Sequence, residues 1–432
     1  MALTLLALVL QHPLVARTLQ PGPPRRAARA RRVVAAADVA PDFAESPAAN
    51  TYVGDESVPP GPYAVSWLAT DQGKDSEKWI EFDERHYMSM VQDKPRTDAF
   101  VRALQERLAA FPPGTATVLD LGTGPYALFA RAAMDFGARK VYAVEAVPES
   151  AARAREAVAL AEAAPQCPVT PGSIEVLEGF STDVELPEKV DVLISEIAGS
   201  IASEEGVYAT IVDAQRRFMK RPRDPGSYVP FSYQTLGAPA TDLCHHSGGA
   251  DPTAPCLRIP SEDATLRMLA DPLLVEDIRF AGDAPANGSV DEALAWRVDP
   301  DRVAANEAHF RAILEPNREA VEEDGLDVER LARDVSRSLS GIALWPRIVF
   351  DEAGTHVYDT RGPTGEQQLS HWPTVLPPLA PRPLPVAPGA VVTATWSTDL
   401  RDGQVSTPIR YSLLCDIAAE AAAAPVGRAP DR

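Results

Sequence analysis

Hydrophobic positions in the first half of the chain alternate between two kinds of spacing. Short, almost continuous apolar runs are separated by longer segments in which apolar residues recur at helical spacing. This alternation predicts βαβ units and therefore a parallel sheet with helices packed on it. The four expected strands lie within residues 115–122, 140–146, 172–179 and 190–197.

The pattern changes beyond residue 226, where proline and β-branched residues become more frequent. Strand-like pieces at 228–238, 341–351, 390–398 and 409–417 predict an antiparallel β domain. A polar segment with helical periodicity, residues 291–339, predicts a helical insertion in that domain. We therefore expect an α/β domain over residues 77–225 and a β domain over residues 226–418.

The two ends of the chain differ from these domains in composition. No acidic residue precedes Asp38, whereas six arginines do, and the first ten residues are largely apolar. Such a segment is typical of an organelle-targeting leader, here residues 1–37, for a plastid or a mitochondrion. The alternative is a retained, disordered basic arm on a cytoplasmic protein. We expect residues 38–76 to be a flexible lead-in and residues 419–432 a disordered tail.

Charge and cysteine content narrow the class of partner. The 432 residues include 61 acidic and 41 basic side chains, a formal net charge of −20. A protein that binds nucleic acid through its phosphates needs a basic face, so nucleic acid is not an expected partner. No apolar run has the roughly 20 residues that span a bilayer, and we expect no membrane partner. The four cysteines form no CxxC pair, and Cys244, His245, His246 and Cys256 lack regular metal-ligand spacing, so no metal site is predicted.

A candidate cofactor site lies at the end of the first strand. Gly122 and Gly124 allow a sharp turn, and Glu145 ends the next strand, where a carboxylate can bind both ribose hydroxyls. The turn also satisfies a dinucleotide fingerprint, GxGxxA. However, Asp120 would repel a pyrophosphate and would suit the cationic groups of S-adenosylmethionine, which we therefore prefer over a dinucleotide.

A candidate reaction site follows the fourth strand. Glu196 and Glu205 lie nine positions apart, and a short loop can bring two such carboxylates together. Converging carboxylates share a proton, hold a metal or bind a cation, and a planar guanidinium satisfies both through forked hydrogen bonds. The alternative is that Glu204 and Glu205 form a solvated helix start.

The chain resembles the protein arginine methyltransferases in these same motifs. The resemblance rests on VLDLGTG (118–124), VYAVEA (141–146), DVELPEKVDVLISEIAG (183–199) with the following EEG, and Ser370-His371-Trp372. It implies a Rossmann-like class I methyltransferase domain followed by an antiparallel β-barrel domain. It also implies S-adenosylmethionine as cofactor and basic, arginine-containing proteins as substrates.

The resemblance assigns roles to individual residues. Glu196 and Glu205 would bind the substrate arginine, and Glu204 would replace Glu205 if the loop is shifted by one residue. Asp93 would pair with His371. Arg96 would bind the carboxylate of the donor. Ser181 and Thr182 align where many members have an adenine-contacting glutamate, so we place them at the cofactor site although they supply no carboxylate. Met90 and Trp372 are expected to line the substrate side.

The family usually dimerises through an arm inserted in the barrel, and residues 291–339 are a candidate for that arm. An unrelated insertion is the alternative. Two other functions remain open: methylation of another side chain or a small molecule on the same fold, and a catalytically degenerate protein that only binds the donor or arginine. The alternative to a functional His371 and Asp93 is an ordinary loop histidine and a helix-surface acid.

Overall fold

The structure is a computed structural model of the chain. It describes residues 61–69, 87, 89, 90, 92–164, 169–248, 254–282, 289–400 and 409–418. The expected leader (1–37) and tail (419–432) lie outside the described residues, as does most of the lead-in.

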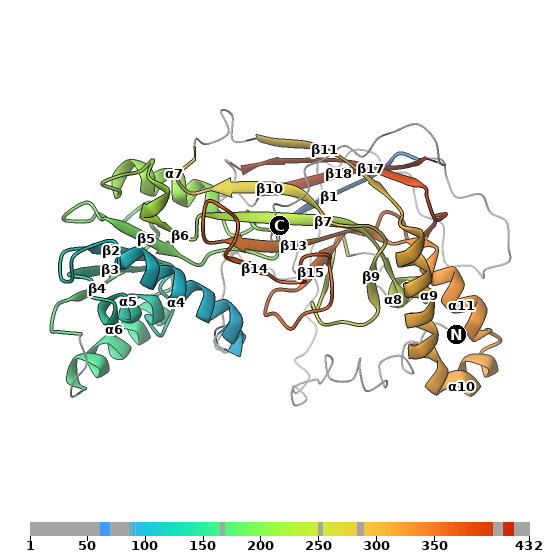
Figure 1. Cartoon of the computed structure of the whole chain (residues 1–432), viewed down its shortest axis with the longest axis horizontal. Helices are drawn as coiled ribbons and strands as arrows, with labels where there is room; N and C mark the ends of the chain where they lie inside the picture. Colours follow the sequence, from blue (N-terminus) through green and yellow to red (C-terminus); the bar gives the residue numbers. More distant parts are fainter. Residues whose placement is uncertain are drawn as a thin grey trace, which may run out of the picture.

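A five-stranded parallel sheet forms the first domain, at the left of Figure 1, in the order β4-β3-β2-β5-β6. Its central strand is fully buried, and glycine-containing turns and helices follow the strands, as the alternating pattern predicted. The strands are β2 (Thr117–Leu121), β3 (Lys140–Glu145), β4 (Ile174–Glu178), β5 (Val192–Ser195) and β6 (Tyr228–Val229). The helices are α4 (Lys94–Leu108), α5 (Leu128–Asp135), α6 (Pro148–Ala163) and α7 (Val207–Arg217), and a 3-10 turn, η1 (Pro225–Ser227), precedes β6.

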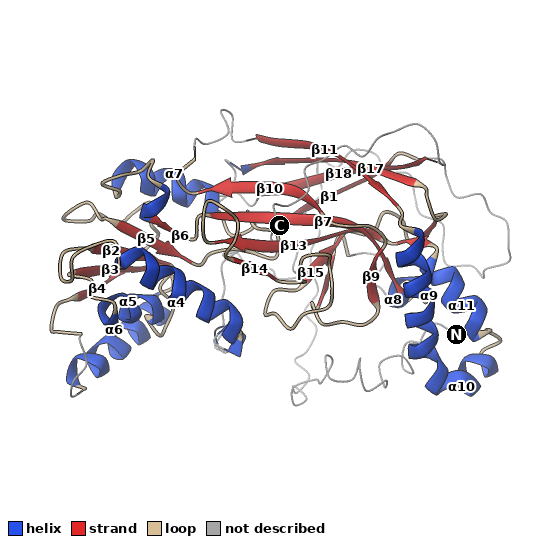
Figure 2. Cartoon of the chain, viewed as in Figure 1, coloured by secondary structure: helices blue, strands red, loops and turns tan. Residues whose placement is uncertain are grey.

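The second domain is an antiparallel β-barrel domain built mainly from two larger sheets, drawn in red in Figure 2. One sheet has the order β1-β18-β17-β11: β1 (Tyr63–Leu68), β18 (Arg410–Ala418), β17 (Val391–Asp399) and β11 (Ser289–Arg297). The other is centred on β7 (Ser232–Asp242) and β13 (Gly341–Val349). Around them lie β8 (Leu257–Ile259), β9 (Leu266–Met268), β10 (Leu273–Arg279), β14 (Val357–Asp359) and β15 (Thr374–Leu376), and β12 (Ser338–Leu339) pairs separately with β16 (Leu384–Pro385).

Two boundaries expected from the sequence are wrong. Residues 63–68 belong to the supposed flexible lead-in, but they form β1, which pairs with β18 along its whole length. Trp67 of β1 is buried against Trp396 and Tyr411, and this packing helps to hold the strand in the sheet. The start of the expected helical insertion is instead β11, since Asp291 to Arg297 pair with β17.

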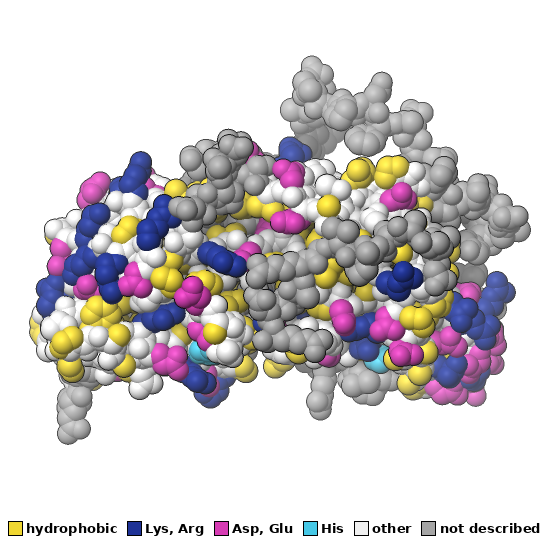
Figure 3. Space-filling model, turned by 45° about the horizontal axis from the view of Figure 1, so that its top comes forward, with side chains coloured by type: hydrophobic (Ala, Val, Ile, Leu, Met, Phe, Trp, Pro, Cys, Tyr) yellow, Lys and Arg dark blue, Asp and Glu magenta, His cyan; other side chains and the backbone are white. Residues whose placement is uncertain are grey.

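The helical part of the insertion begins at Pro300. It comprises α9 (Pro300–Leu314), η2 (Glu315–Asn317), α10 (Arg318–Glu323) and α11 (Val328–Ser336), and the short helix α8 (Leu243–His246) lies beside it in Figure 1. These helices have a hydrophobic cluster of their own, with Phe310 and Val335 fully buried. Figure 3 shows acidic and basic side chains intermixed over this end of the molecule.

The two domains share a core. Tyr233, Ile348 and Phe350 of the barrel pack in the same buried cluster as the strands of the parallel sheet. Because the junction is packed, loops from the barrel are held against the carboxyl ends of the parallel strands. Among the described residues, we find no helix with the length and apolar content needed to cross a bilayer.

Candidate active site

The turn after β2 is shaped by the two glycines that the sequence singled out. Gly122 and Gly124 have φ values of +74° and +65°, a conformation that favours glycine. A Cβ on Gly122 would lie 2.8 Å from Cγ2 of Ile197, so a side chain there would collide with the loop that follows β5. The turn and that loop are therefore in close contact.

Asp120 lies beneath this turn and is fully buried. Its Oδ2 accepts hydrogen bonds from Thr123 Oγ1 (2.6 Å) and from the Ala130 N–H (3.0 Å) in the first turn of α5. Its Oδ1 is buried without a hydrogen-bond partner in the described part of the chain. Burial raises the pKa of Asp120 to about 7, against these hydrogen bonds. An acceptor atom without a partner fits a cationic group of a donor molecule, which is the role we predict for Asp120.

Glu145 occupies the end of β3, next to the glycine turn. Its two carboxylate oxygens accept hydrogen bonds from the Gly124 N–H and the Val147 N–H, each at 2.9 Å. Burial raises its pKa, and these N–H groups oppose the shift. The backbone thus fixes the carboxylate at the carboxyl end of the sheet, where α/β folds bind nucleosides. The residues fit the adenosine part of S-adenosylmethionine.

Arg96 comes from the first turn of α4 and reaches the end of β5. Its guanidinium forms an ion pair with Glu196, in which the two side chains are 5% and 6% exposed. Its Nη1 also donates to Thr97 Oγ1 (3.3 Å), whereas its Nε is buried without a hydrogen-bond partner. A buried donor without an acceptor is costly, and the carboxylate of a methyl donor would satisfy it.

Residues 196–206, here called the acidic loop, carry the three expected glutamates. Burial raises the pKa of Glu205 well above its usual range, and the nearby carboxylates of Glu196 and Glu204 raise it further. Glu205 is therefore near enough to both carboxylates for their charges to interact. The Glu204 carboxylate is already engaged, since it accepts hydrogen bonds from Arg258 and from the Ser200 N–H. The sequence had kept Glu204 as a substitute for Glu205, and its substrate role stays untested.

Asp93 and His371 are in contact, as expected. The His371 Nδ1 lies 2.9 Å from Asp93 Oδ2, and the Tyr358 hydroxyl donates to both carboxylate oxygens. Burial alone would raise the pKa of Asp93, but these hydrogen bonds outweigh it and lower the pKa. Asp93 also caps α4 by accepting from the Arg96 N–H. One carboxylate therefore joins the barrel loop to the helix that carries Arg96.

Trp372 is buried, and its indole Nε1–H donates to the carbonyl oxygen of Ala198 at 2.7 Å. This contact fastens the barrel loop to the acidic loop, so Trp372 supports the site from behind; its expected contact with substrate stays a prediction. Met90 is partly exposed and lies three residues before Asp93. Its expected place in the substrate slot also stays a prediction.

Ser181 and Thr182 follow β4, the neighbour of β3 in the sheet. The Ser181 carbonyl accepts a hydrogen bond from Arg217, and the exposed Thr182 hydroxyl donates to Asp183 at 3.3 Å. Their expected contact with the cofactor is not tested by these interactions.

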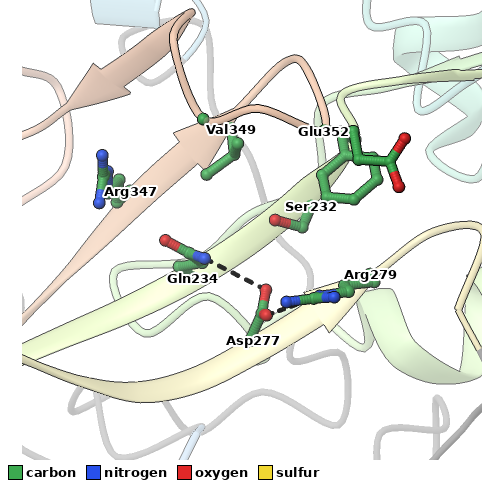
Figure 4. Close-up of a pocket in the computed structure, with 9 residues that line it drawn as sticks. Ser232, Gln234, Asp277, Arg279, Arg347, Val349 and Glu352 are labelled. Carbon is green, nitrogen blue, oxygen red and sulfur yellow. Dashed lines mark hydrogen bonds and ion pairs between the residues drawn. The ribbon is translucent and has the colours of Figure 1, made fainter. Parts of the chain in front are cut away.

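A small cavity of about 50 Å³ lies elsewhere, on β7, β10 and β13 (Figure 4). Gln234 and Arg279 line it. Tyr233 and Thr235, the neighbours of Gln234 in β7, instead form hydrogen bonds with Ser195 at the end of β5 and with Ala202 in the acidic loop. Side chains alternate between the faces of a strand, so this cavity belongs to the opposite face of the sheet. No group of three or more His, Cys, Asp or Glu among the described residues could hold a metal ion.

Sequence reasoning missed several residues that support the site. Tyr358 and Arg258 carry no local motif, and they reach Asp93 and Glu204 only through the tertiary fold. Tyr87 also lies at the site without a local motif that singles it out. It lies over the glycine turn, 3.5 Å from where a Gly124 Cβ would be, and its hydroxyl accepts from Ser150 Oγ (3.0 Å).

The chain is similar in sequence to several plant proteins over about a third of its length. It is 38% identical over 135 residues to protein arginine N-methyltransferase PRMT10 of Arabidopsis thaliana, which is 31% of this chain and 32% of that protein. It is 37% identical over 134 residues to the probable histone-arginine methyltransferase 1.4 of the same plant, 31% of this chain and 24% of the relative. The aligned stretch thus spans a third or less of these relatives, and no family model matches the chain.

Two solved structures share the fold over most of the chain. Arabidopsis protein arginine methyltransferase 10, reported in a uniquely open conformation, superposes with a TM-score of 0.57 at 20% identity, covering 80% of this chain and 96% of that one. The Trypanosoma brucei PRMT1 enzyme–prozyme heterotetramer with AdoHcy gives 0.53 at 20% identity, covering 72% and 87%. At this identity the likeness concerns the fold alone.

Proposed function

We propose that this chain is a protein arginine methyltransferase, which transfers a methyl group from S-adenosylmethionine to a guanidinium nitrogen of protein arginine. Its likeness to plant arginine methyltransferases over about a third of its length supports this. One observation carries the proposal. Glu196, which pairs with Arg96, is close enough to Glu205 for their charges to interact, at the same sheet edge as the glycine turn and Glu145. A cation-binding pair therefore lies next to a site that fits an adenosine-containing donor.

The residues on the donor side fit S-adenosylmethionine by charge and position. Glu145 would bind the ribose hydroxyls, Asp120 a cationic group, and Arg96 the carboxylate through its unpartnered Nε. Gly122 and Gly124 leave the backbone open to close approach. When bound, the donor supplies a methyl group on a sulfonium, which is electrophilic without further activation.

The residues on the acceptor side would aim one nitrogen of the guanidinium at that methyl group. Arginine is not deprotonated in water, so the site must localise the positive charge on the other nitrogens and fix the geometry. Glu196 and Glu205 would do this through forked hydrogen bonds. The nitrogen loses its proton as the bond to the methyl carbon forms. The raised pKa of Glu205 suits that carboxylate to hold this proton.

The test is methyl transfer to matched peptides. We expect mass spectrometry to detect a methyl group on an arginine-rich peptide and none on the same peptide with lysine in place of arginine. Glu196→Gln should lower the rate by roughly 100-fold, since a buried charged contact is worth about 3 kcal/mol. Glu188→Gln, at a partly exposed carboxylate paired with Arg139, serves as the control.

Each alternative gives a different result in the same experiment. If calorimetry detects donor binding but the peptide gains no mass, the chain is a protein that only binds the donor. Methyl transfer to lysine or to a small molecule would leave another enzyme on this fold. Either result would refute arginine methylation.

For partners we propose basic, arginine-containing proteins and a homodimer. The net charge of −20 supports the first, since an acidic protein attracts cationic segments. The helical insertion α9–α11 supports the second, since it is a candidate dimerisation arm whose apolar side chains cluster with Leu243 and Ala264. Light scattering of the chain with and without residues 300–336 tests the dimer; a monomer in both cases would refute it.

For location we propose import into a plastid or mitochondrion, supported by the acid-free, arginine-rich residues 1–37. A fluorescent protein fused behind these residues should accumulate in one organelle. Uniform cytoplasmic fluorescence would refute the leader.

A further inference from the structure

The barrel holds three consecutive residues of the acidic loop. The Ala202 N–H donates to Thr235 Oγ1 at 2.9 Å, and the Ser203 hydroxyl donates to the Glu276 carboxylate at 3.1 Å. The third residue, Glu204, accepts hydrogen bonds from Arg258. These barrel side chains come from three different strands, β7, β10 and β8, so the whole sheet fixes the register of the loop.

Arg258 binds Glu204 as a fork. Its Nη1 lies 3.2 Å from Glu204 Oε2 and its Nη2 contacts Oε1, while Oε2 also accepts from the Ser200 N–H at 3.0 Å. The Glu204 side chain is only 5% exposed. It is folded back along the loop, because a Cβ on Gly199 would lie 2.4 Å from Glu204 Cβ. Both oxygens of Glu204 are therefore committed to the protein.

Glu205, the next residue, has different electrostatic surroundings. No described residue forms an ion pair with it, although Arg258 attracts it at longer range and Glu196 and Glu204 repel it. The two adjacent glutamates thus differ: Glu204 binds Arg258 of the barrel, whereas Glu205 has no ion-pair partner among the described residues.

We propose that Arg258 is a positioning residue of the reaction: it holds Glu204 out of the acceptor slot and so makes Glu205 the second carboxylate that binds the guanidinium. This inference rests on the proposed function. The charges are consistent with it. The three ionised carboxylates and the two guanidiniums of Arg96 and Arg258 leave one net negative charge, which one acceptor guanidinium neutralises. Without Arg258 the slot would hold two net negative charges and two competing carboxylates.

The test compares Arg258→Met with Arg258→Met/Glu204→Gln. Arg258→Met should raise KM for the arginine peptide at least 10-fold. Because Arg258 favours the ionised form of Glu205, its loss should also move the acid limb of kcat/KM to higher pH. Removing both charges should bring KM back to within about threefold of wild type. Affinity for S-adenosylhomocysteine should stay within twofold throughout.

Two further variants complete the design. Arg279→Met is a control. Arg279 pairs with Asp277 at the cavity shown in Figure 4, on the face of the sheet that points away from the acidic loop, so the KM of this variant should equal that of wild type. Glu205→Gln should cost more activity than Glu204→Gln. If Arg258→Met alone does not fold, the double variant, which has no orphaned charge, and Arg258→Lys, which keeps the charge without the fork, provide the same comparison.

The inference is overturned if Arg258→Met leaves both KM and the acid limb unchanged, or if Glu204→Gln is the more damaging of the two glutamate variants. Wild-type protein that methylates no arginine would instead refute the proposed function. The two failures are therefore distinguishable.

Discussion

Arg96 of α4 and Glu196 at the end of β5 form a buried ion pair that joins the predicted donor site to the predicted acceptor site. Each side chain is expected to bind a ligand of opposite charge to its own. The protein thus keeps both charges paired in a buried position until ligands compete for them. Removing either charge leaves the other uncompensated.

Replacing Arg96 by methionine should weaken donor binding. The guanidinium offers a buried Nε donor, and a charge-assisted hydrogen bond contributes roughly 1.5–3 kcal/mol, so affinity should fall about 10- to 100-fold. Calorimetry with S-adenosylhomocysteine measures this. Arg102→Met, at an exposed position of the same helix paired with Glu106, is the control. Unchanged affinity in Arg96→Met would exclude Arg96 from the donor site.

Replacing Asp93 by asparagine should lower kcat without unwinding α4. Asparagine caps a helix as well as aspartate does, so the loss falls on the charged contacts with His371 and Tyr358. Since the folded-state pKa of Asp93 is lowered, its stabilising effect is present above the ordinary pKa, about 4, and is lost as pH falls further.

The measurement is urea unfolding of both proteins from neutral to acidic pH, together with kcat. Asp299→Asn is a matched control, because Asp299 caps α9 far from the site. An equal effect of the two substitutions on kcat would contradict the role of Asp93.

Replacing Trp372 by phenylalanine should loosen the acidic loop. The ring still fills the core, but the hydrogen bond to the Ala198 carbonyl is lost, at a cost of about 1–2 kcal/mol in the free energy of unfolding. Because Ala198 lies two residues from Glu196, KM for an arginine peptide should rise while donor affinity stays constant. If only the donor affinity changes, the Trp372–Ala198 hydrogen bond supports the donor side of the site and not the acceptor side.

Local patterns in the sequence were sufficient for one part of this site. The strand ends, Gly122, Gly124 and Glu145 lie close together because parallel strands bring their carboxyl ends to one edge, and alternating periodicity predicts such strands. The His371–Asp93 contact followed from family resemblance, since 278 positions separate the two residues.

Other parts depend on tertiary packing that leaves no local pattern. Arg258 lies in a three-residue strand, and nothing near it in sequence indicates that it binds Glu204. The segment that forms β1 appeared irregular because its order comes from pairing with β18, more than 340 residues away. The first strand of the supposed insertion, β11, was hidden for the same reason: its partner β17 is distant in sequence.

Replacing Glu276 by glutamine should remove a pH dependence of stability. Burial raises the pKa of Glu276 to about 7, so the folded protein retains a proton that the unfolded chain releases near the ordinary pKa. This carboxyl therefore favours the folded state below its ordinary pKa, and the benefit is lost as pH rises through about 7. At pH 8 the variant should exceed wild type by about 3 kcal/mol in the free energy of unfolding.

Chemical denaturation at pH 5 and pH 8 checks this. The difference between the variant and wild type should grow in favour of the variant as pH rises. Asp120, whose pKa is also about 7, remains in both proteins and cancels. Glu178→Gln, at a partly exposed carboxylate, should show no such trend. A constant difference at both pH values would contradict a protonated Glu276.

The pairing of β1 with β18 limits where a processing peptidase could cleave this protein. Trp67 of β1 packs on Tyr411, with ring centroids 5.5 Å apart, and the Tyr411 hydroxyl lies 3.0 Å from Ser203 Oγ in the acidic loop. Cleavage after Leu68 would remove β1, leave β18 as an open edge and remove the packing of Trp67 behind that hydroxyl. If the proposed leader is removed, its cleavage site must therefore lie upstream of β1 for the acidic loop to keep this support.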